Sequence, residues 1–263
     1  MRYSALAGGK LLRPVLVMAA AECAGGPEAV NDGVECAAAA VELVHTYSLV
    51  HDDLPAMDDD DMRRGQPANH VVYGEAIAIL AGDALLTRAF EVLATLPERG
   101  VEPERAVRVI RELAEAAGTL GLIGGQVDDL AATEGRVDLA TLQSIHQRKT
   151  GALFRACVRI GGLLGGAGED DLARLTDYAS ALGAAFQLVD DILDVVGDTA
   201  EMGKRAGSDQ RRGKVTIPSL IGLEEARRMA EEETERAVAS LSGFGPRADL
   251  LRWLVRRILA RRR

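Results

Sequence analysis

Apolar residues recur every three or four positions along most of this chain, which is the spacing of one buried helix face. Long stretches that alternate apolar and polar residues, as strands do, are few. Glycine, proline, aspartate or glutamate stands near most of the boundaries between the periodic stretches. Helices are therefore predicted over residues 12–25, 28–54, 75–96, 103–120, 138–165, 169–197, 216–241 and 246–260, with a loop over 55–70.

Composition agrees with a helical protein of one domain. The 263 residues are 48% hydrophobic and only 3% aromatic, and they are rich in the good helix formers alanine and leucine. A chain of this length can bury one large core, and no low-complexity linker divides it. We expect a single all-α domain over residues 1–263.

Charge and cysteine content exclude several classes of protein. The formal net charge of -9 argues against a general nucleic-acid binder, whereas a small acidic substrate needs only a local basic pocket. No apolar run reaches the roughly 18 to 20 residues of a membrane span. Cys23, Cys36 and Cys157 are scattered without CxxC spacing, so we expect neither disulfides nor a zinc site, and a cytoplasmic location.

Two acidic clusters, over residues 51–58 and 190–194, each follow an apolar helix-patterned run directly. Carboxylates placed this densely on apolar helices repel one another and lose solvation, so they need a counter-ion. Divalent metal together with a polyanion is the most economical counter-ion. The clusters predict a metal-bridged diphosphate site.

The second cluster forms one face of a helix. At about 100° per residue, its polar side chains share an arc, and apolar residues occupy the opposite side. The alternative is a solvated acidic surface, but repeated like charges destabilise a helix and no nearby Lys or Arg compensates them here. The polar side chains on this arc are Gln187, Asp190, Asp191, Asp194 and Asp198.

The first cluster is arranged differently. His45 and Asp52 lie within about 20° of each other on a helix, whereas Asp58 would lie about 240° away. Pro55 ends the helix and frees the following loop to bring Asp58 back toward the same ions. For residues 59–61 the alternative is an ordinary acidic turn. Carboxylate oxygens are the ligands that magnesium prefers.

The dipeptide His51-Asp52 suggests a rival function, a phosphohydrolase that binds transition metals through His and Asp. That chemistry needs more histidines than the four in this chain. We therefore do not favour it.

Basic residues recur at several points of the chain. Singly, each is explained as a surface charge, but together with two acidic clusters they suit two diphosphates, one held through metal and one by cations alone. A basic stretch over residues 203–213 is expected to form a mobile loop that could close over an anion. The basic residues concerned are Lys10, Arg13, Arg63, Arg64, Lys149, Lys204 and Lys214.

Seven motifs give the chain a specific resemblance over residues 3–241. They are GGKLLRP, HTYSLVHDDLPAMDDDDMRRG, GEAIAILAGDALL, GGQVDDL, QRKTGAL, FQLVDDILDVVGD and GKRAGSDQRRGKVTIPSL. In this order they resemble the trans-isoprenyl diphosphate synthases of the polyprenyl synthetase family, most closely the bacterial farnesyl diphosphate synthases. The resemblance implies a helical bundle around a deep central cavity, with the two acidic motifs facing each other across its mouth.

The resemblance also implies a role for individual residues. Metal ligands for about three Mg²⁺ ions, with Mn²⁺ as a possible substitute, would be Asp52, Asp53, Asp58, Asp190 and Asp194. The allylic diphosphate would contact Arg63, Lys149 and Lys204, with Lys214 nearby. Isopentenyl diphosphate would be bound by Lys10, Arg13, His45 and Arg64, and the reacting centre would be lined by Thr150 and Gln187. The implied catalytic residues are Asp52, Asp53, Asp58, Lys149, Thr150, Gln187, Asp190 and Lys204.

The activity that the resemblance implies is condensation of isopentenyl diphosphate with dimethylallyl and then geranyl diphosphate, giving farnesyl diphosphate. Tyr47 and Ser48, about 6 to 8 Å deeper along the helix than Asp52, are candidates for the residues that limit chain length. The wheel places Ser48 near the Asp52 face and Tyr47 away from it, so it does not establish which residue limits the product. The alternatives are a geranylgeranyl diphosphate synthase, a non-catalytic prenyltransferase subunit and a terpene cyclase. The family suggests a homodimer.

Three features depart from the family pattern or lie outside it. Relatives usually have one or two helices before GGKLLRP, so we expect this chain to lack the usual N-terminal helix or helices. Leu11 and Leu12 occupy a stretch where many relatives have an additional basic residue, which would weaken isopentenyl diphosphate binding slightly. The arginine-rich end, residues 252–263, is expected to be a solvated helix end rather than part of the site.

Overall fold

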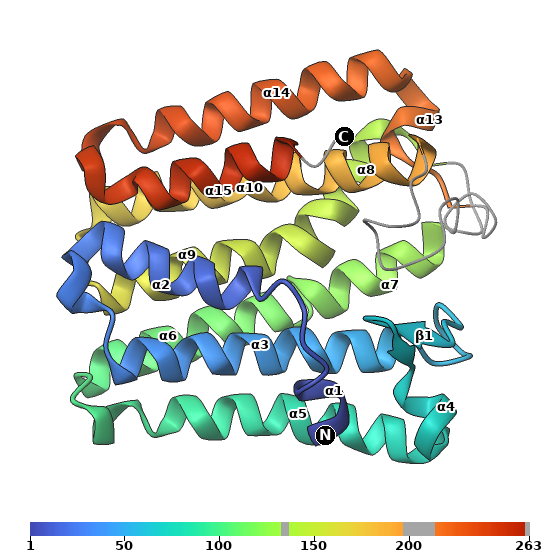
Figure 1. The fold of residues 1–263 in the computed structure, drawn as a ribbon, viewed down its shortest axis with the longest axis horizontal. Coiled ribbons are helices and arrows are strands. Elements are labelled where there is room, and N and C mark those ends of the chain that lie inside the picture. Colours follow the sequence, from blue (N-terminus) through green and yellow to red (C-terminus); the bar gives the residue numbers. More distant parts are fainter. Residues whose placement is uncertain (133–136, 197–213, 261–263) are drawn as a thin grey trace.

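The protein is a bundle of helices that lie side by side along its longest axis (Figure 1). A computed structural model describes residues 1–132, 137–196 and 214–260. Within these ranges the only sheet is a two-residue antiparallel pair, in which Met62 lies opposite Pro67. The predicted all-α class is therefore confirmed.

The described residues form the following helices and strands. The elements are α1 (Arg2–Ala5), α2 (Leu12–Gly25), η1 (Pro27–Ala29), α3 (Asp32–Asp52), β1 (Met62–Arg63), β2 (Gln66–Pro67), α4 (Asn69–Tyr73), α5 (Glu75–Ala94), η2 (Leu96–Arg99), α6 (Pro103–Ala117), α7 (Leu122–Ala132), α8 (Leu139–His146), η3 (Gln147–Gly151), α9 (Ala152–Leu164), α10 (Glu169–Val196), α13 (Ile217–Ile221), α14 (Leu223–Ser240), η4 (Ser242–Ala248) and α15 (Asp249–Leu259).

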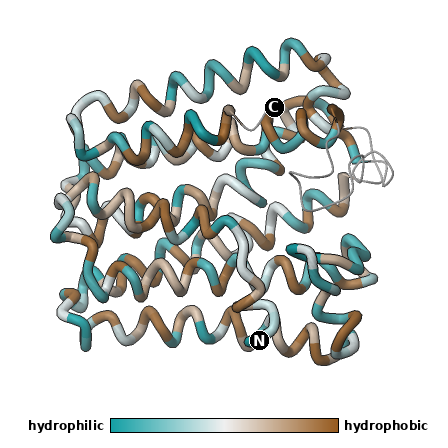
Figure 2. The backbone as a smooth tube through the Cα atoms, in the orientation of Figure 1, coloured by the Kyte–Doolittle hydropathy of each residue, from teal (hydrophilic) through white to brown (hydrophobic). Residues whose placement is uncertain are grey.

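Small residues let the central helices pack closely. Helix α9 contacts α2, α6 and α10, and α10 in turn packs against α14 and α15. A Cβ atom on Gly161 of α9 would lie 2.1 Å from the carbonyl oxygen of Val17 in α2, so only glycine permits this approach. Hydrophobic and hydrophilic residues both recur along the helices, as expected when one face of a helix is buried (Figure 2).

The structure corrects several predicted boundaries. The long helix predicted to start at residue 28 begins at Asp32, where the side chain of Asn31 caps it by accepting from two backbone N–H groups. The predicted loop over 55–70 contains the β1–β2 pair. The helix predicted over 216–241 is divided into α13 and α14, because Gly222 has a φ of 87° and interrupts the helix.

The helix predicted over 138–165 is interrupted by a π-helical turn, η3, between α8 and α9. Hydrophobic periodicity cannot reveal a single wider turn, because the apolar face resumes on both sides of it. Such turns often mark functional sites in helical proteins. This one carries Lys149 and Thr150.

No helix among the described residues is long and apolar enough to cross a membrane. Cys23, Cys36 and Cys157 are all free thiols, and the first and last of them are buried. Burial raises the pKa of Cys157 to about 12, so this thiol stays protonated and inert.

Candidate active site

Carboxylates from two distant segments line one cavity. Asp52 lies at the end of α3, Asp58 in the turn that follows it, and Asp190 on α10. The cavity is partly open to solvent and has a volume of about 210 Å³. Its wall also carries Arg63, Asp129, His146, Lys149, Thr150, Gln187, Asp191 and Lys214.

The turn after α3 folds back on the end of that helix. The backbone N–H of Asp58 donates to the carbonyl of Asp52 at 2.8 Å, and that of Asp60 donates to the carbonyl of Asp53 at 3.2 Å. Helix α3 ends shortly before Pro55, so the chain can reverse here, as the sequence predicted. The reversal brings Asp58 to the same cavity as Asp52.

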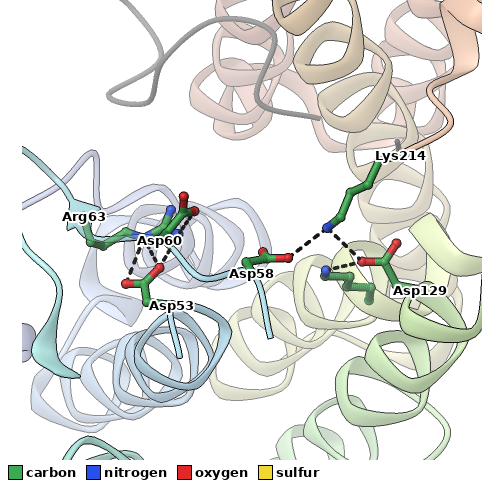
Figure 3. Close-up of polar contacts among 7 residues, drawn as sticks. Asp53, Asp58, Asp60, Arg63, Asp129 and Lys214 are labelled. Carbon is green, nitrogen blue, oxygen red and sulfur yellow. Dashed lines mark hydrogen bonds and ion pairs between the residues drawn. The ribbon is translucent and has the colours of Figure 1, made fainter. Parts of the chain in front are cut away.

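Asp53 points away from Asp58 and toward Arg63 (Figure 3). The Nε of Arg63 donates to both carboxylate oxygens of Asp53, at 2.9 and 3.2 Å, and its Nη2 donates to Asp60 at 3.1 Å. Only 2% of Asp53 is exposed. Of the three expected ligands in the first motif, Asp52 and Asp58 line the cavity, whereas Asp53 holds Arg63 in place.

The donor set of the cavity suits a divalent cation. Burial raises the pKa of the Asp52 carboxyl to about 6 despite the ammonium group of Lys149, and Asp58 adds to the rise. Asp52, Asp58 and Asp190 thus supply carboxylate oxygens to one cavity, and burial there disfavours the ionised form of Asp52. Hard oxygen donors of this kind are the ligands that Mg²⁺ prefers.

Lysines reach the cavity from two directions and meet at Asp129 (Figure 3). The Nζ of Lys149 lies 2.7 Å from Asp129 Oδ2, and the Nζ of Lys214 lies 3.4 Å from the same oxygen and 3.0 Å from Asp58 Oδ1. Burial by itself would raise the pKa of Asp129, but the two ammonium groups lower it. A diphosphate entering the cavity would meet these two cations together.

Asp129 is a site residue that the sequence analysis did not single out. It belongs to the GGQVDDL motif, which carried the family resemblance but received no chemical role. A Cβ on Gly125 would lie 2.3 Å from the backbone nitrogen of Lys149, so this glycine lets α7 approach η3 closely. In the sequence, two adjacent glycines one helical turn before two adjacent aspartates could have indicated this residue.

The π-turn η3 and helix α10 bring two polar side chains together at the inner wall. The hydroxyl of Thr150 donates to Oε1 of Gln187 at 3.2 Å. Gln187 lies one turn before Asp190 and Asp191 on α10. Asp194, one turn further on, is 6% exposed. Asp198, Lys204 and the predicted basic loop over 203–213 lie outside the described residues.

A second group of cations surrounds His45. Burial lowers the pKa of His45 well below 6.5, and the neighbouring charges of Arg13, Arg64 and Arg63 lower it further, so the imidazole is neutral. The Nε of Arg13 is buried and has no hydrogen-bond partner among the described residues, while its guanidinium carbon lies 5.1 Å from the ring centre of Phe154. This arrangement leaves positive charge that an anion could neutralise.

Arg64 and Lys10 lie at the edge of this second group. Arg64 donates to Glu42 at 3.0 Å and to the carbonyl of Gly8. Helix α2 begins at Leu12 after a left-handed residue, so Lys10 lies in the turn before the helix and Arg13 lies within it. Lys10 is exposed to solvent.

The two candidate chain-length residues are both buried on α3. Tyr47 is 4% exposed and its ring meets that of His51 edge-on, and within the described part of the chain its hydroxyl has no hydrogen-bond partner. Ser48 donates to the carbonyl of His45 at 2.9 Å. The Tyr47 ring is therefore an apolar surface in the interior, one turn or more below Asp52.

Comparison with known proteins agrees with this geometry. The family model of polyprenyl synthetases matches residues 1–243. The chain is 50% identical over 249 residues to geranylgeranyl pyrophosphate synthase 9 of Arabidopsis thaliana, covering 94% of this chain and 68% of that protein. It is 46% identical over 261 residues to farnesyl diphosphate synthase of Bacillus subtilis, covering 99% and 87%.

A solved structure extends the likeness to the fold. The crystal structure of geranyltransferase from Helicobacter pylori, complexed with magnesium and isoprenyl diphosphate, superposes with a TM-score of 0.86 at 31% identity. The match covers 99% of this chain and 86% of that one.

Proposed function

The chain belongs to the polyprenyl synthetase family and is a trans-prenyl diphosphate synthase, and from this premise we propose that it makes farnesyl diphosphate. In the proposed reaction an allylic diphosphate, first dimethylallyl and then geranyl, loses its diphosphate as the C–O bond breaks. The alkene of isopentenyl diphosphate supplies the electron pair for the new C–C bond, and a proton then leaves to the released diphosphate. The observation that carries the proposal is the single cavity lined by Asp52, Asp58 and Asp190 with Lys149 and Lys214.

Magnesium is the cofactor of the proposal. Asp52, Asp58 and Asp190 would hold it, with Asp194 of the second motif as a further candidate, and about three ions would suit the two motifs. When bound, Mg²⁺ supplies positive charge to the diphosphate oxygens as the C–O bond breaks. Mn²⁺ is proposed as a substitute. In place of a direct metal contact, we assign Asp53 the task of orienting Arg63, because both its carboxylate oxygens accept from that side chain.

Cations of the chain bind and stabilise the allylic diphosphate. Lys149 and Lys214 reach the cavity together, and Arg63 lines it from the other side. Lys204 is assigned to the same diphosphate by its motif. Positive charge fixed in advance where negative charge develops lowers the barrier, because no reorganisation is needed during the reaction.

The second group of cations is assigned to isopentenyl diphosphate. Arg13, Arg64 and His45 lie close enough to affect one another's charge, and Lys10 lies in the turn before α2. The buried Nε of Arg13 lacks a partner that a phosphate oxygen would supply. Binding there would place the alkene beside the allylic carbon, and such positioning replaces a bimolecular encounter with an intramolecular one.

The inner wall of the cavity would protect the allylic cation from water. Thr150 and Gln187 are assigned to the reacting centre because both side chains line this wall. Apolar side chains of Leu49, Leu142 and Ile145 line it as well. A cation in such surroundings meets the positioned alkene instead of solvent.

Product length is proposed as fifteen carbons because the Tyr47 ring is buried on α3 below Asp52 and would end the growing chain. A twenty-carbon product is the second candidate, since a geranylgeranyl pyrophosphate synthase is among the relatives at 50% identity. A non-catalytic subunit is less favoured, because carboxylates of both acidic motifs line the cavity.

A homodimer is part of the proposal. Apolar side chains are exposed on α5 and α7, among them Leu80 at 61% and Ile77 at 52% on α5, and Val127 at 61% on α7. A second copy of the chain would remove such surface from water. Light scattering after gel filtration should give twice the mass of one chain, and the mass of a single chain would contradict this part of the proposal.

The reaction is tested with purified protein, isopentenyl diphosphate, dimethylallyl diphosphate and Mg²⁺. Mass spectrometry of the products should show farnesyl diphosphate and inorganic diphosphate, and removal of Mg²⁺ by a chelator should abolish both. Geranylgeranyl diphosphate as the main product would support the second candidate. No prenyl product with any allylic substrate would overturn the assignment as an active synthase.

A further inference from the structure

A chain of hydrogen bonds lies behind the inner wall of the cavity. The Thr150 hydroxyl donates to Gln187 Oε1 at 3.2 Å, and Gln187 Nε2 donates to Asp191 Oδ1 at 2.9 Å. The other oxygen of Asp191, Oδ2, accepts from the backbone N–H of Ile217 at 2.9 Å. Asp191 is 4% exposed.

The carboxylate decides which way the Gln187 amide faces. An ionised carboxylate only accepts hydrogen bonds, so the amide NH₂ must point at Asp191 and the amide oxygen at Thr150. The Thr150 hydroxyl then donates its hydrogen bond to that oxygen. Both side chains line the cavity, and at this wall the Gln187 amide therefore directs its oxygen, not its NH₂ group, toward Thr150.

The orientation matters because positive charge develops at that carbon in the proposed reaction. Fixed partial negative charges stabilise it, whereas an amide NH₂ in the same place would oppose it. Asp190, the neighbour of Asp191, lines the cavity with the proposed metal ligands. Of these adjacent aspartates, Asp191 is the one bonded to Gln187 and to the backbone of Ile217.

Asp191 also fixes the segment that carries Lys214. Its bond to Ile217 lies at the first residue of α13, where Thr216 and Ser219 form a reciprocal cap. Lys214, three residues earlier, reaches Asp58 and Asp129 across the cavity. One buried carboxylate therefore joins the reacting centre to the segment that supplies a diphosphate-binding cation.

We propose that Asp191 is a positioning residue that holds the carbonyl oxygen of Gln187 toward the reacting carbon. The inference rests on the proposed function and deepens it. It concerns a residue that acts through Gln187, not a contact with substrate or metal.

Asp191→Asn separates positioning from a purely structural role. The asparagine is isosteric, and its Oδ1 still accepts from Ile217, so the anchor of α13 survives. Its NH₂ group, however, faces the Gln187 amide, which must flip and present its own NH₂ to the cavity. We expect kcat to fall about 10- to 100-fold, with KM for both substrates within about twofold and the melting temperature within about 3 °C.

A paired exchange should restore the orientation. In Asp191→Asn with Gln187→Glu, the asparagine NH₂ donates to the new carboxylate, and a carboxylate oxygen again faces Thr150. The double variant should be at least about fivefold faster than Asp191→Asn, while Gln187→Glu alone places two carboxylates against each other and should be slower than the double. The matched control is Asp177→Asn, on the exposed side of α10, which should match the wild type.

The outcomes separate this inference from the function on which it rests. If the wild type forms no prenyl product, the proposed function fails and not the positioning. If the wild type is active but kcat of Asp191→Asn stays within about twofold, the positioning is wrong. The positioning role is also overturned if the double variant is no faster than the slower of the two single variants. If Asp191→Asn does not fold, the double variant is compared with Gln187→Glu alone.

Discussion

Carboxylates that look equivalent in the sequence have different partners in the structure. Asp53 is committed to Arg63, Asp129 to two lysines, and Asp191 to an amide and a backbone N–H. Asp52 and Asp190 line the cavity as the proposed metal ligands. At the scale of single residues, the site thus contains carboxylates that could bind metal and others that hold cations or amides in place.

The role of Asp129 as the anchor of two lysines predicts a specific loss. In Asp129→Asn the ammonium groups of Lys149 and Lys214 lose their shared counter-charge and their fixed positions. We expect kcat/KM for the allylic diphosphate to fall about tenfold in steady-state assays. Asp128→Asn is the matched control, because Asp128 pairs with Arg148 outside the cavity wall. Equal effects of the two substitutions would contradict the role.

Tyr47 predicts the length of the product. Tyr47→Ala removes the buried ring on α3 and should shift the products from fifteen carbons toward twenty or more. Tyr47→Phe is the control, since the hydroxyl has no partner and its loss should leave the product spectrum unchanged. Mass spectrometry of the products decides, and an unchanged spectrum in Tyr47→Ala would reject Tyr47 as the residue that limits growth.

His146 makes the stability of the fold depend on pH. Burial lowers its pKa to about 4, so between pH 6.5 and 4 the unfolded chain binds a proton that the folded chain does not. The free energy of unfolding should therefore fall as the pH falls, with His146 contributing about 2 kcal/mol between pH 7.5 and pH 5. Urea unfolding at both pH values should show that His146→Gln loses about this much of the dependence. An equal pH dependence of the unfolding free energy in the wild type and in His146→Gln would contradict this prediction.

Much of the site was predictable at this scale, but not its internal pairing. A helical wheel places Asp190 and Gln187 on one face, and the structure puts both on the cavity wall. The wheel cannot show that Arg63, ten residues later, returns to Asp53. Such contacts depend on how the turn after Pro55 closes, and no local periodicity encodes that path.

Among the elements, the π-turn η3 has the largest effect on the site. It interrupts the helix predicted over 138–165 and carries Lys149, which reaches Asp129, and Thr150, which reaches Gln187. Hydrophobic periodicity predicted that the long elements exist and that they are helices. It did not predict the wide turn, because the apolar periodicity resumes on both sides of it.

The close approach of α7 to η3 can be tested at Gly125. A methyl group there would lie 2.3 Å from the backbone nitrogen of Lys149, so in Gly125→Ala the turn must move. We expect a loss of about 1–3 kcal/mol in unfolding free energy, together with lower activity because Lys149 is displaced. Gly168→Ala, whose added carbon meets open space, is the control and should keep its activity. Full activity in Gly125→Ala would refute the argument.

On the scale of the whole molecule, the bundle joins segments that are more than a hundred residues apart. Helix α3 brings Asp52 to one side of the cavity, and α10 brings Asp190 to the other. Composition and periodicity predicted an all-α protein, but only the family resemblance predicted that these motifs face each other. Lys204 and the basic stretch around it remain predictions, since they lie outside the described residues.

The central claim is that carboxylates of both motifs act together in prenyl transfer. The most direct test is the rate of farnesyl diphosphate formation by Asp52→Ala and Asp190→Ala at saturating Mg²⁺, with Asp61→Ala, an exposed residue of the same acidic turn as Asp58, as control. We predict that each of the first two falls by about 100-fold or more, whereas the control stays near the wild type. Rates within a few fold of the wild type for Asp52→Ala or Asp190→Ala would contradict the account.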